Sequence, residues 1–185
     1  DMSDLTVNVA TSTFTATPAN DTINGIVLTN GDSADLTFDV DNNTFAGPTS
    51  VTNFTAHTAL YVVSADTGAI DAPINGYFRN NGAMSNQNFG VVIDVRNNAP
   101  HALAIANNTF GSVRTRAIDY VSGVHAGDAS AGHLTITGNS CSATAIGADR
   151  CAFITPTQSS TLCTNVRQNT FTANGATFYY VNEGE

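Results

Sequence analysis

The stretches VDNNTF (residues 40–45) and IANNTF (residues 105–110) repeat nearly the same turn at two places in the chain. When the rest of the sequence is aligned on this turn, four further segments fit the same pattern. One column of the alignment is polar in every segment: Ser12, Asn43, Asn81, Asn108, Asn139 and Asn169. These positions are separated by 31, 38, 27, 31 and 30 residues, so the chain repeats a unit of about 31 residues six times. Repeats of this length are typical of solenoids, in which each unit stacks on its neighbours to bury a shared core.

Each repeat contains two segments with the pattern of a β-strand. The segment before the turn alternates apolar and polar residues, as in LTFDV (36–40), which is the pattern of a strand with one buried face. A second, apolar segment begins with Gly, Ala or Thr: GIVLT (25–29), ALYVV (59–63), GVVID (90–94), AIDYV (117–121), AFITP (152–156) and TFYYV (177–181). The sequence therefore predicts an all-β chain with two strands in each repeat.

A second column lies two residues after the polar one and is mostly aromatic: Phe14, Phe45, Ala83, Phe110, Cys141 and Phe171. An antiparallel sandwich would explain the alternation and the turn residues, but not a polar column at a fixed offset from an aromatic one. In a parallel coil, equivalent residues of successive turns lie about 4.8 Å apart, so Asn side chains can hydrogen-bond to one another and Phe rings can stack. Asn also tolerates the left-handed backbone of a sharp corner. We therefore predict that NNTF is a corner that is copied once per coil.

This combination of an Asn ladder and a Phe stack resembles the right-handed parallel β-helix of the pectate-lyase-like superfamily. It is also similar to the β-helix repeats of bacterial and phage surface proteins. The resemblance covers nearly the whole chain and implies a right-handed parallel β-helix, or β-solenoid, of about six coils. We expect residues 1–185 to form a single domain that is a segment of a longer chain, since the sequence opens with DMSD and closes with NEGE.

The composition restricts the partners that the chain can have. Only 11% of the residues are charged, all six basic residues are Arg, and 15 acids give a formal net charge of −9. Nucleic acids and anionic membrane surfaces are therefore improbable partners, because both attract basic proteins. The longest apolar stretches are only a few residues long, so we expect no membrane insertion.

An outward column of the second strand family is unexpectedly apolar. With inward and outward residues alternating, this column should read Val27, Tyr61, Val92, Asp119, Ile154 and Tyr179. An apolar stripe on a protein surface is usually covered. We predict a subunit interface in a trimer or filament through Val27, Tyr61, Val92, Ile154 and Tyr179; the alternative is a cover supplied by the protein's own loops or by missing flanking segments.

Acidic residues gather before and within the strand at 36–40: Asp32, Asp35, Asp39 and Asp41. Polysaccharide lyases and hydrolases of the fold that the chain resembles place acids, with Arg or Lys, on an outward strand face. Asp39 and Asp41 have the separation of a glycosidase pair, about 6.6 Å along a strand. No convergent Arg or second acidic coil is predicted to support them, so solvated surface charges are the simpler interpretation. A calcium site is a further alternative, although the spacing is not that of an EF-hand.

The histidines do not form a recognisable metal site, and the cysteines indicate an extracellular setting. His101 and His133 come from adjacent coils, but no third ligand is apparent, so no metal or other cofactor is predicted. Three cysteines in an acidic, Asn-rich chain favour one disulfide. Sequence cannot decide the pairing, and we favour Cys141 with Cys151, which would staple the SATAIGADR loop.

These observations predict an extracellular or cell-surface structural module, adhesive or fibre-forming, whose partner is a second copy of itself or a cell-surface glycan. No catalytic residues are predicted. The alternative is a carbohydrate-active or carbohydrate-binding β-helix that uses the acidic cluster and its neighbouring loops. Its exposed aromatic residues, which could stack on sugars, would be Tyr61, Tyr77 and Tyr179.

Overall fold

The chain folds as a parallel β-solenoid. The structure is a computed structural model that describes residues 4–15, 24–31, 34–47, 57–64, 72–85, 87–111, 113–124, 127–143, 150–173 and 177–180. Within these residues the chain forms β-strands and no helix. The strands belong to three parallel sheets of six strands each, and every repeat contributes one strand to each sheet. The predicted fold class is therefore confirmed.

The three sheets follow one another along each repeat. The first sheet contains the strands that precede the NNTF-like turns: β1 (Leu5–Ala10), β4 (Leu36–Asp41), β7 (Ile74–Arg79), β10 (His101–Ala106), β13 (Ala131–Thr137) and β16 (Thr161–Arg167). The second sheet contains the short strands after the turns: β2 (Thr13–Thr15), β5 (Thr44–Ala46), β8 (Gly82–Ser85), β11 (Thr109–Phe110), β14 (Ser140–Ala143) and β17 (Thr170–Ala173). The third sheet contains the apolar segments: β3 (Asn24–Asn30), β6 (Thr58–Ser64), β9 (Gln87–Val95), β12 (Val113–Ser122), β15 (Arg150–Pro156) and β18 (Phe178–Tyr180).

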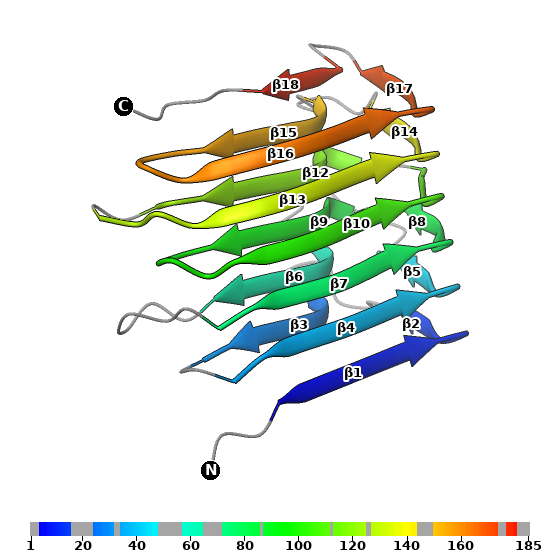
Figure 1. The fold of residues 1–185 in the computed structure, drawn as a ribbon. Coiled ribbons are helices and arrows are strands. Elements are labelled where there is room, and N and C mark those ends of the chain that lie inside the picture. The colour runs from blue at the N-terminus through cyan, green and yellow to red at the C-terminus, as the bar shows by residue number, and fades with distance from the viewer. Residues whose placement is uncertain are drawn as a thin grey trace.

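Successive turns climb along one axis, and the sheets form the sides of the coil (Figure 1). The first-sheet strands run in one direction across the front of this view, and the third-sheet strands return behind them in the opposite direction. The front strands run from left to right and the back strands from right to left, while the chain rises from the N-terminus at the bottom to the C-terminus at the top. This combination of rotation and rise makes the coil right-handed. Neighbouring strands pair in register, so equivalent residues lie side by side, as Asn8 does with Asp39 and Asp39 with Tyr77.

Two details of the predicted coil were wrong. Each repeat has three strands rather than two, because the residues after the corner form the second sheet. About four turns, rather than six, make up the fully packed stack. The outer repeats contribute strands, but their inward side chains are covered on one side only: Leu5 is 50% exposed and Val166 is 39% exposed, whereas Leu36 and Leu134 are buried.

The corner after each first-sheet strand has a left-handed backbone. The first Asn of the turn carries this conformation, with φ of 54° at Asn42, 54° at Asn80 and 56° at Asn107. Asn adopts positive φ more readily than other non-glycine residues because its short polar side chain can hydrogen-bond locally. The first Asn of NNTF therefore sets the bend, and the second Asn has a different role.

The second Asn of the turn is buried and belongs to a hydrogen-bonded ladder. The backbone N–H of Asn43 donates to Oδ1 of Asn81 at 2.9 Å, and that of Asn81 donates to Oδ1 of Asn108 at 3.0 Å. The Nδ2 groups of the same residues donate to the same oxygen atoms at 3.1 and 3.0 Å. Backbone-to-side-chain bonds of this kind link every turn from Ser12 through Asn139 to Asn169.

Each ladder amide also binds the turn before it. Nδ2 of Asn108 donates to the carbonyl of Phe78 at 2.8 Å, and Nδ2 of Asn81 donates to the carbonyl of Val40 at 3.0 Å. A corner would otherwise bury backbone N–H and C=O groups that no strand can pair, and an unpaired buried group is costly. The ladder therefore satisfies the backbone at the corner between the first and second sheets, where the sheet pattern is interrupted.

Large side chains of the second sheet face small residues of the third sheet across the core. A Cβ atom added to Gly90 would lie 2.4 Å from the ring of Phe110, and one added to Gly25 would lie 2.9 Å from the ring of Phe45. Only small residues therefore fit opposite the rings. The small column reads Gly25, Ala59, Gly90, Ala117 and Cys151.

The predicted Phe column needs one correction. Met84, not Ala83, fills the third repeat, because the pairing of β5 with β8 shifts by one residue between Thr44 and Ala46. Phe14 and Phe45 stack with ring centroids 4.9 Å apart and an interplanar angle of 7°. The complete column reads Phe14, Phe45, Met84, Phe110, Cys141 and Phe171. Ring stacking is therefore interrupted wherever Met84 or Cys141 replaces an aromatic side chain.

In the fifth repeat cysteines occupy both the column of large residues on the second sheet and the column of small residues on the third sheet. Cys141 occupies the Phe column and Cys151 the small column, and the two form a disulfide with Cα atoms 5.9 Å apart. This pairing is the one that the sequence analysis favoured. The disulfide joins β14 to β15, while Cys163 of the first sheet is free and exposed.

We expect Asn108→Ala to lower the free energy of unfolding by about 3 kcal/mol, measured by chemical denaturation. The substitution leaves the buried N–H of Asn81 and the carbonyl of Phe78 without their partners, and each such group costs about 1–3 kcal/mol. Asn107→Gly is the matched control, because Asn107 is exposed and Gly138 occupies the equivalent corner of the next turn. Equal destabilisation by the two substitutions would contradict a special role for the ladder.

Reduction of the disulfide is expected to lower the free energy of unfolding by about 2–3 kcal/mol, because the bond closes a short loop in the unfolded chain. The measurement is denaturation with and without dithiothreitol. Cys163→Ser should respond to the reductant as the unsubstituted protein does, since Cys163 forms no part of the bond. Loss of the response in Cys163→Ser would show that a different pair is oxidised.

Candidate functional site

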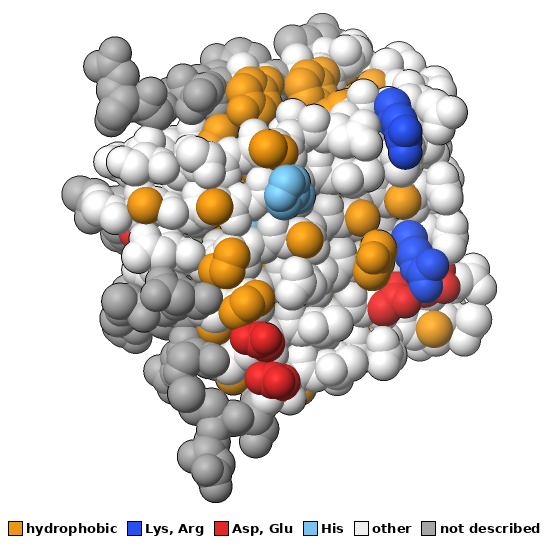
Figure 2. Space-filling model, viewed as in Figure 1, with side chains coloured by type: hydrophobic (Ala, Val, Ile, Leu, Met, Phe, Trp, Pro, Cys, Tyr) orange, Lys and Arg blue, Asp and Glu red, His pale blue; other side chains and the backbone are white. Residues whose placement is uncertain are grey.

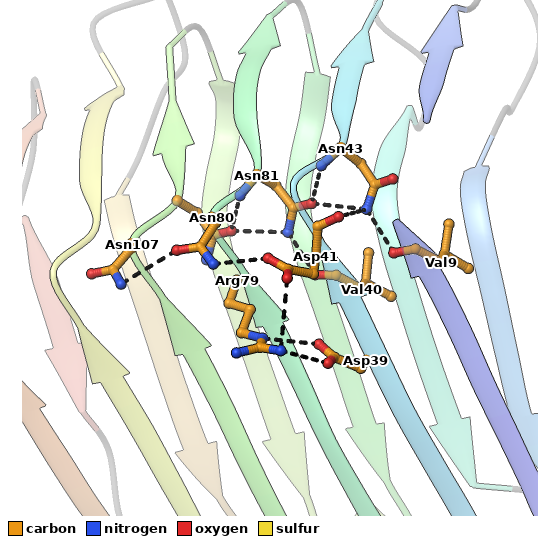
Figure 3. A network of polar contacts seen from close by, with 10 residues as sticks. Val9, Asp39, Val40, Asp41, Asn43, Arg79, Asn80, Asn81 and Asn107 are labelled. Atoms are coloured by element: carbon orange, nitrogen blue, oxygen red, sulfur yellow. Dashed lines mark hydrogen bonds and ion pairs between the residues drawn. The ribbon is translucent and has the colours of Figure 1, made fainter. Parts of the chain in front are cut away.

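The acids on the first sheet are bound by an arginine from the next turn. Asp39 and Asp41 lie on β4, and Arg79 lies on β7 directly beside Asp41 in the register. Arg79 forms a two-point ion pair with Asp39, in which Nε donates at 3.0 Å and a terminal nitrogen donates at 2.7 Å (Figure 3). The same guanidinium lies 3.7 Å from Asp41. The hydrogen bond to Asp39 raises the pKa of Arg79 above its usual value.

A polar chain continues from this ion pair along the corner. Nδ2 of Asn80 donates to Asp41 at 2.8 Å, and Nδ2 of Asn107 donates to Asn80 at 3.4 Å (Figure 3). At the other end of β4, the backbone N–H of Asp35 donates to Asp4 at 3.4 Å. Asp32 lies outside the described residues.

These contacts correct one expectation about the acidic cluster. The sequence analysis predicted no convergent Arg, although its alignment on the turn already set Arg79 opposite Asp41. The structure shows that the Arg79 side chain reaches both carboxylates. Because Asp39 and Asp41 are engaged by one guanidinium, neither is placed as a free general acid or base beside a vacant cleft. The arrangement joins two turns of the coil and has the features of a structural ion-pair network.

The apolar outward column lies on the third sheet, with one residue changed. Phe153 pairs with Asp119 and is half-buried, whereas Ile154 pairs with Tyr120 and is completely buried. Ile154 was therefore wrongly predicted as an interface residue. The error came from aligning Ala152 with the small column, a position that Cys151 holds. The observed outward column is Val27, Tyr61, Val92, Asp119, Phe153 and Tyr179, and the side chain of Tyr179 is not among those described.

Two ion pairs accompany this column on the outer face of the third sheet. Arg96 binds Asp94 at 2.6 Å, and Arg116 binds both carboxylate oxygens of Asp119 at 2.9 Å. Arg116 also stands 3.8 Å from the centroid of the Phe153 ring, which is cation–π geometry. The four charged side chains are only 12–24% exposed. These two ion pairs are therefore largely shielded from water.

Burial has measurable electrostatic consequences on this face. Desolvation raises the pKa of Asp119 in spite of the opposing charge of Arg116, and desolvation together with Asp94 raises the pKa of Tyr61. Oδ1 of Asp94 and Nε of Arg116 are buried and have no hydrogen-bond partner among the described residues. Each of the two side chains is nevertheless ion-paired through its other atoms, Asp94 with Arg96 and Arg116 with Asp119.

The two histidines considered as a metal pair lie on different sides of the first sheet. His101 pairs with Gly132 and points into the core, while His133 pairs with Ala102 and is exposed. A Cβ atom on Gly132 would lie 1.8 Å from Nε2 of His101, so the glycine makes room for the imidazole. No group of three His, Cys, Asp or Glu side chains in the described residues could hold a metal ion.

His101 joins the first sheet to the third sheet through Tyr120. Nδ1 of His101 lies 3.1 Å from the carbonyl of Ala99, and Nε2 lies 2.5 Å from the Tyr120 hydroxyl. A carbonyl can only accept, so Nδ1 carries the proton and the Tyr120 hydroxyl donates to Nε2. Burial lowers the pKa of His101 and raises the pKa of Tyr120. The neutral pair is the form that the core accommodates.

We expect the protein to lose stability as the pH falls from 7 to 5, because the unfolded chain binds a proton at His101 with a pKa of about 6.5 and the folded chain resists it. The free energy of unfolding should therefore rise with pH in this window, by at most about 1.4 kcal/mol per pH unit for this group. Denaturation at several pH values measures the slope.

His101→Gln should reduce that slope by the contribution of one proton, and the result is compared with His133→Gln, which replaces an exposed histidine on the neighbouring strand. An unchanged slope in His101→Gln would mean that other groups determine the acid sensitivity.

Comparisons with known proteins add no assignment to this geometry. No protein-family model, no curated protein and no solved structure matches the chain. No described segment forms a helix with the length and apolar character needed to cross a membrane.

Proposed function

We propose that this chain is an extracellular structural and adhesive module, and that copies of it associate through the outer face of the third sheet. The observation that carries the proposal is the apolar outward column of Val27, Tyr61, Val92 and Phe153 on the third sheet, in which Val27 is 51% exposed. An apolar stripe of this kind is typical of an interaction surface.

A second copy of the same chain suits this face. The apolar column is accompanied by two acids, Asp94 and Asp119, and by three arginines, Arg96, Arg116 and Arg150, so the face is not acidic although the chain has a formal charge of −9. In an isologous contact each copy offers the same patch to the other, so the apolar columns meet and acids of one copy can face arginines of the other.

A rigid core supports the structural part of the proposal. The ladder and the disulfide join successive turns and adjacent sheets by bonds that are buried. The disulfide also supports an extracellular location, because disulfides persist mainly in oxidising compartments. Membership of the pectate-lyase-like superfamily is part of this proposal as well, and its support is the right-handed parallel coil with an internal Asn ladder.

The association is tested by multi-angle light scattering and sedimentation velocity on Val27→Asp combined with Tyr61→Asp. Two added carboxylates on an apolar contact must be desolvated without partners, so the variant should shift from oligomer to monomer over a range of protein concentrations. Val27→Asp alone serves as the milder variant, because Val27 is 51% exposed and its replacement does not affect the core.

The control is Thr37→Asp combined with Tyr77→Asp, which adds the same charges to exposed positions on the first sheet. It should assemble as the unsubstituted protein does. A monomeric unsubstituted protein at all concentrations, or equal loss of assembly in the control, would overturn the proposed interface.

A further inference from the structure

A valley runs along β10 on the outer face of the first sheet. Its floor is made of the outward side chains of that strand: Ala102, Ala104 and Ala106. The neighbouring strands present larger residues at the paired positions, which are Asn75, Tyr77 and Arg79 on β7 and His133, Thr135 and Thr137 on β13. Side chains stand roughly perpendicular to a sheet, so a strand that presents only methyl groups outward has a lower outer surface than its neighbours.

Two recesses occupy this valley and share part of their lining. The first has a volume of about 380 Å³ and lies between Asn75 and Cys163. The second has a volume of about 320 Å³ and lies between Tyr77 and Thr135. Ala102 and His133 line both, so the recesses form one continuous groove. Volumes above about 300 Å³ are typical of small-molecule sites.

The groove combines an aromatic wall with uncharged polar rims. Tyr77 is 56% exposed and presents its ring beside the floor. The rims carry the Asn75 amide, the His133 imidazole and the Thr135 hydroxyl, which can both donate and accept hydrogen bonds. Neither recess is lined by any Asp, Glu, Lys or Arg of the described residues. Figure 2 shows this face, with the charged side chains toward its edges.

The nearest cation does not give the groove a free charge. Arg79 stands 5.7 Å from the centroid of the Tyr77 ring, but its guanidinium is bound to Asp39. The formal charge of −9 on the chain would also repel an acidic ligand. An extended peptide is poorly matched, because β7, β10 and β13 are paired on both sides and leave no backbone edge for strand addition.

We infer that this groove binds a neutral oligosaccharide, with the Tyr77 ring against a sugar face and Asn75, His133 and Thr135 hydrogen-bonded to hydroxyl groups. The inference rests on the adhesive part of the proposed function and assigns its ligand class. It uses no acid of the Asp35–Asp41 region, and no bond is made or broken in the ligand. The groove is thus a binding site on the first sheet, whereas the proposed association face is on the third sheet.

The test is binding of the whole chain to immobilised and soluble glycans. The probes are neutral cello-, xylo-, manno- and malto-oligosaccharides and the acidic polymers polygalacturonate and heparin. We expect at least one neutral series to bind and both acidic polymers to be rejected. Ala104→Arg fills the groove and Tyr77→Ala removes its wall, and each should weaken binding about tenfold or more, as loss of a central contact does.

Ala10→Arg is the matched control, because Ala10 is an exposed outward residue of β1 on the same sheet but outside the groove. It should bind like the unsubstituted protein. The inference is overturned if no neutral oligosaccharide binds, if acidic polymers bind better, or if Ala104→Arg binds as well as Ala10→Arg. Circular dichroism melts of the same samples show whether each variant is folded.

Failure of this inference can be told apart from failure of the proposed assembly. The variant Val27→Asp with Tyr61→Asp should keep glycan binding while losing assembly, and Thr37→Asp with Tyr77→Asp should keep assembly while losing glycan binding. If both properties disappear in the same variant, the two surfaces are not independent and the groove assignment is rejected.

Discussion

The structure depends on the need to satisfy backbone groups at a bend that every turn must make. A solenoid corner interrupts the ladder of strand hydrogen bonds, and the buried N–H and C=O groups there need other partners. The second Asn of the NNTF turn supplies them. The Asn81 oxygen accepts from the backbone N–H of Asn43 in the preceding turn, and its nitrogen donates both to the Val40 carbonyl of that turn and to Oδ1 of Asn108 in the following turn. One side chain therefore ties each corner to the turns on both sides of it.

The interior beyond the corner is governed by size rather than by polarity. Rings of the second sheet leave room only for small residues on the third sheet, as Gly90 opposite Phe110 shows. The disulfide between Cys141 and Cys151 occupies the same space with a covalent bond. This explains how three very different solutions, an aromatic ring, a thioether and a disulfide, can follow one another in one column of a regular coil.

Because the repeat prescribes the inward positions, function can vary only on the outward ones. The first sheet carries an ion-pair network around Arg79 and, beside it, the alanine-floored valley of β10. The third sheet carries the apolar stripe with its two ion pairs. Two faces of one scaffold thus have separate chemistry, and a change on one face need not disturb the other.

The sequence by itself determined the parallel solenoid, the ladder column and the favoured disulfide. The solenoid and the ladder follow from positions that recur in every repeat, and the disulfide follows from two cysteines that flank one loop of the fifth repeat. The sequence could not place Phe153 or Met84 correctly, because those positions depend on a bulge and on the register between turns, which a single-residue shift changes and which no local pattern records. It aligned Arg79 with Asp41 but did not predict the contacts of its side chain, since the direction of a long side chain is decided only in three dimensions. The groove along β10 also emerged only in three dimensions, since a depression depends on the heights of side chains from three strands that lie far apart in the chain.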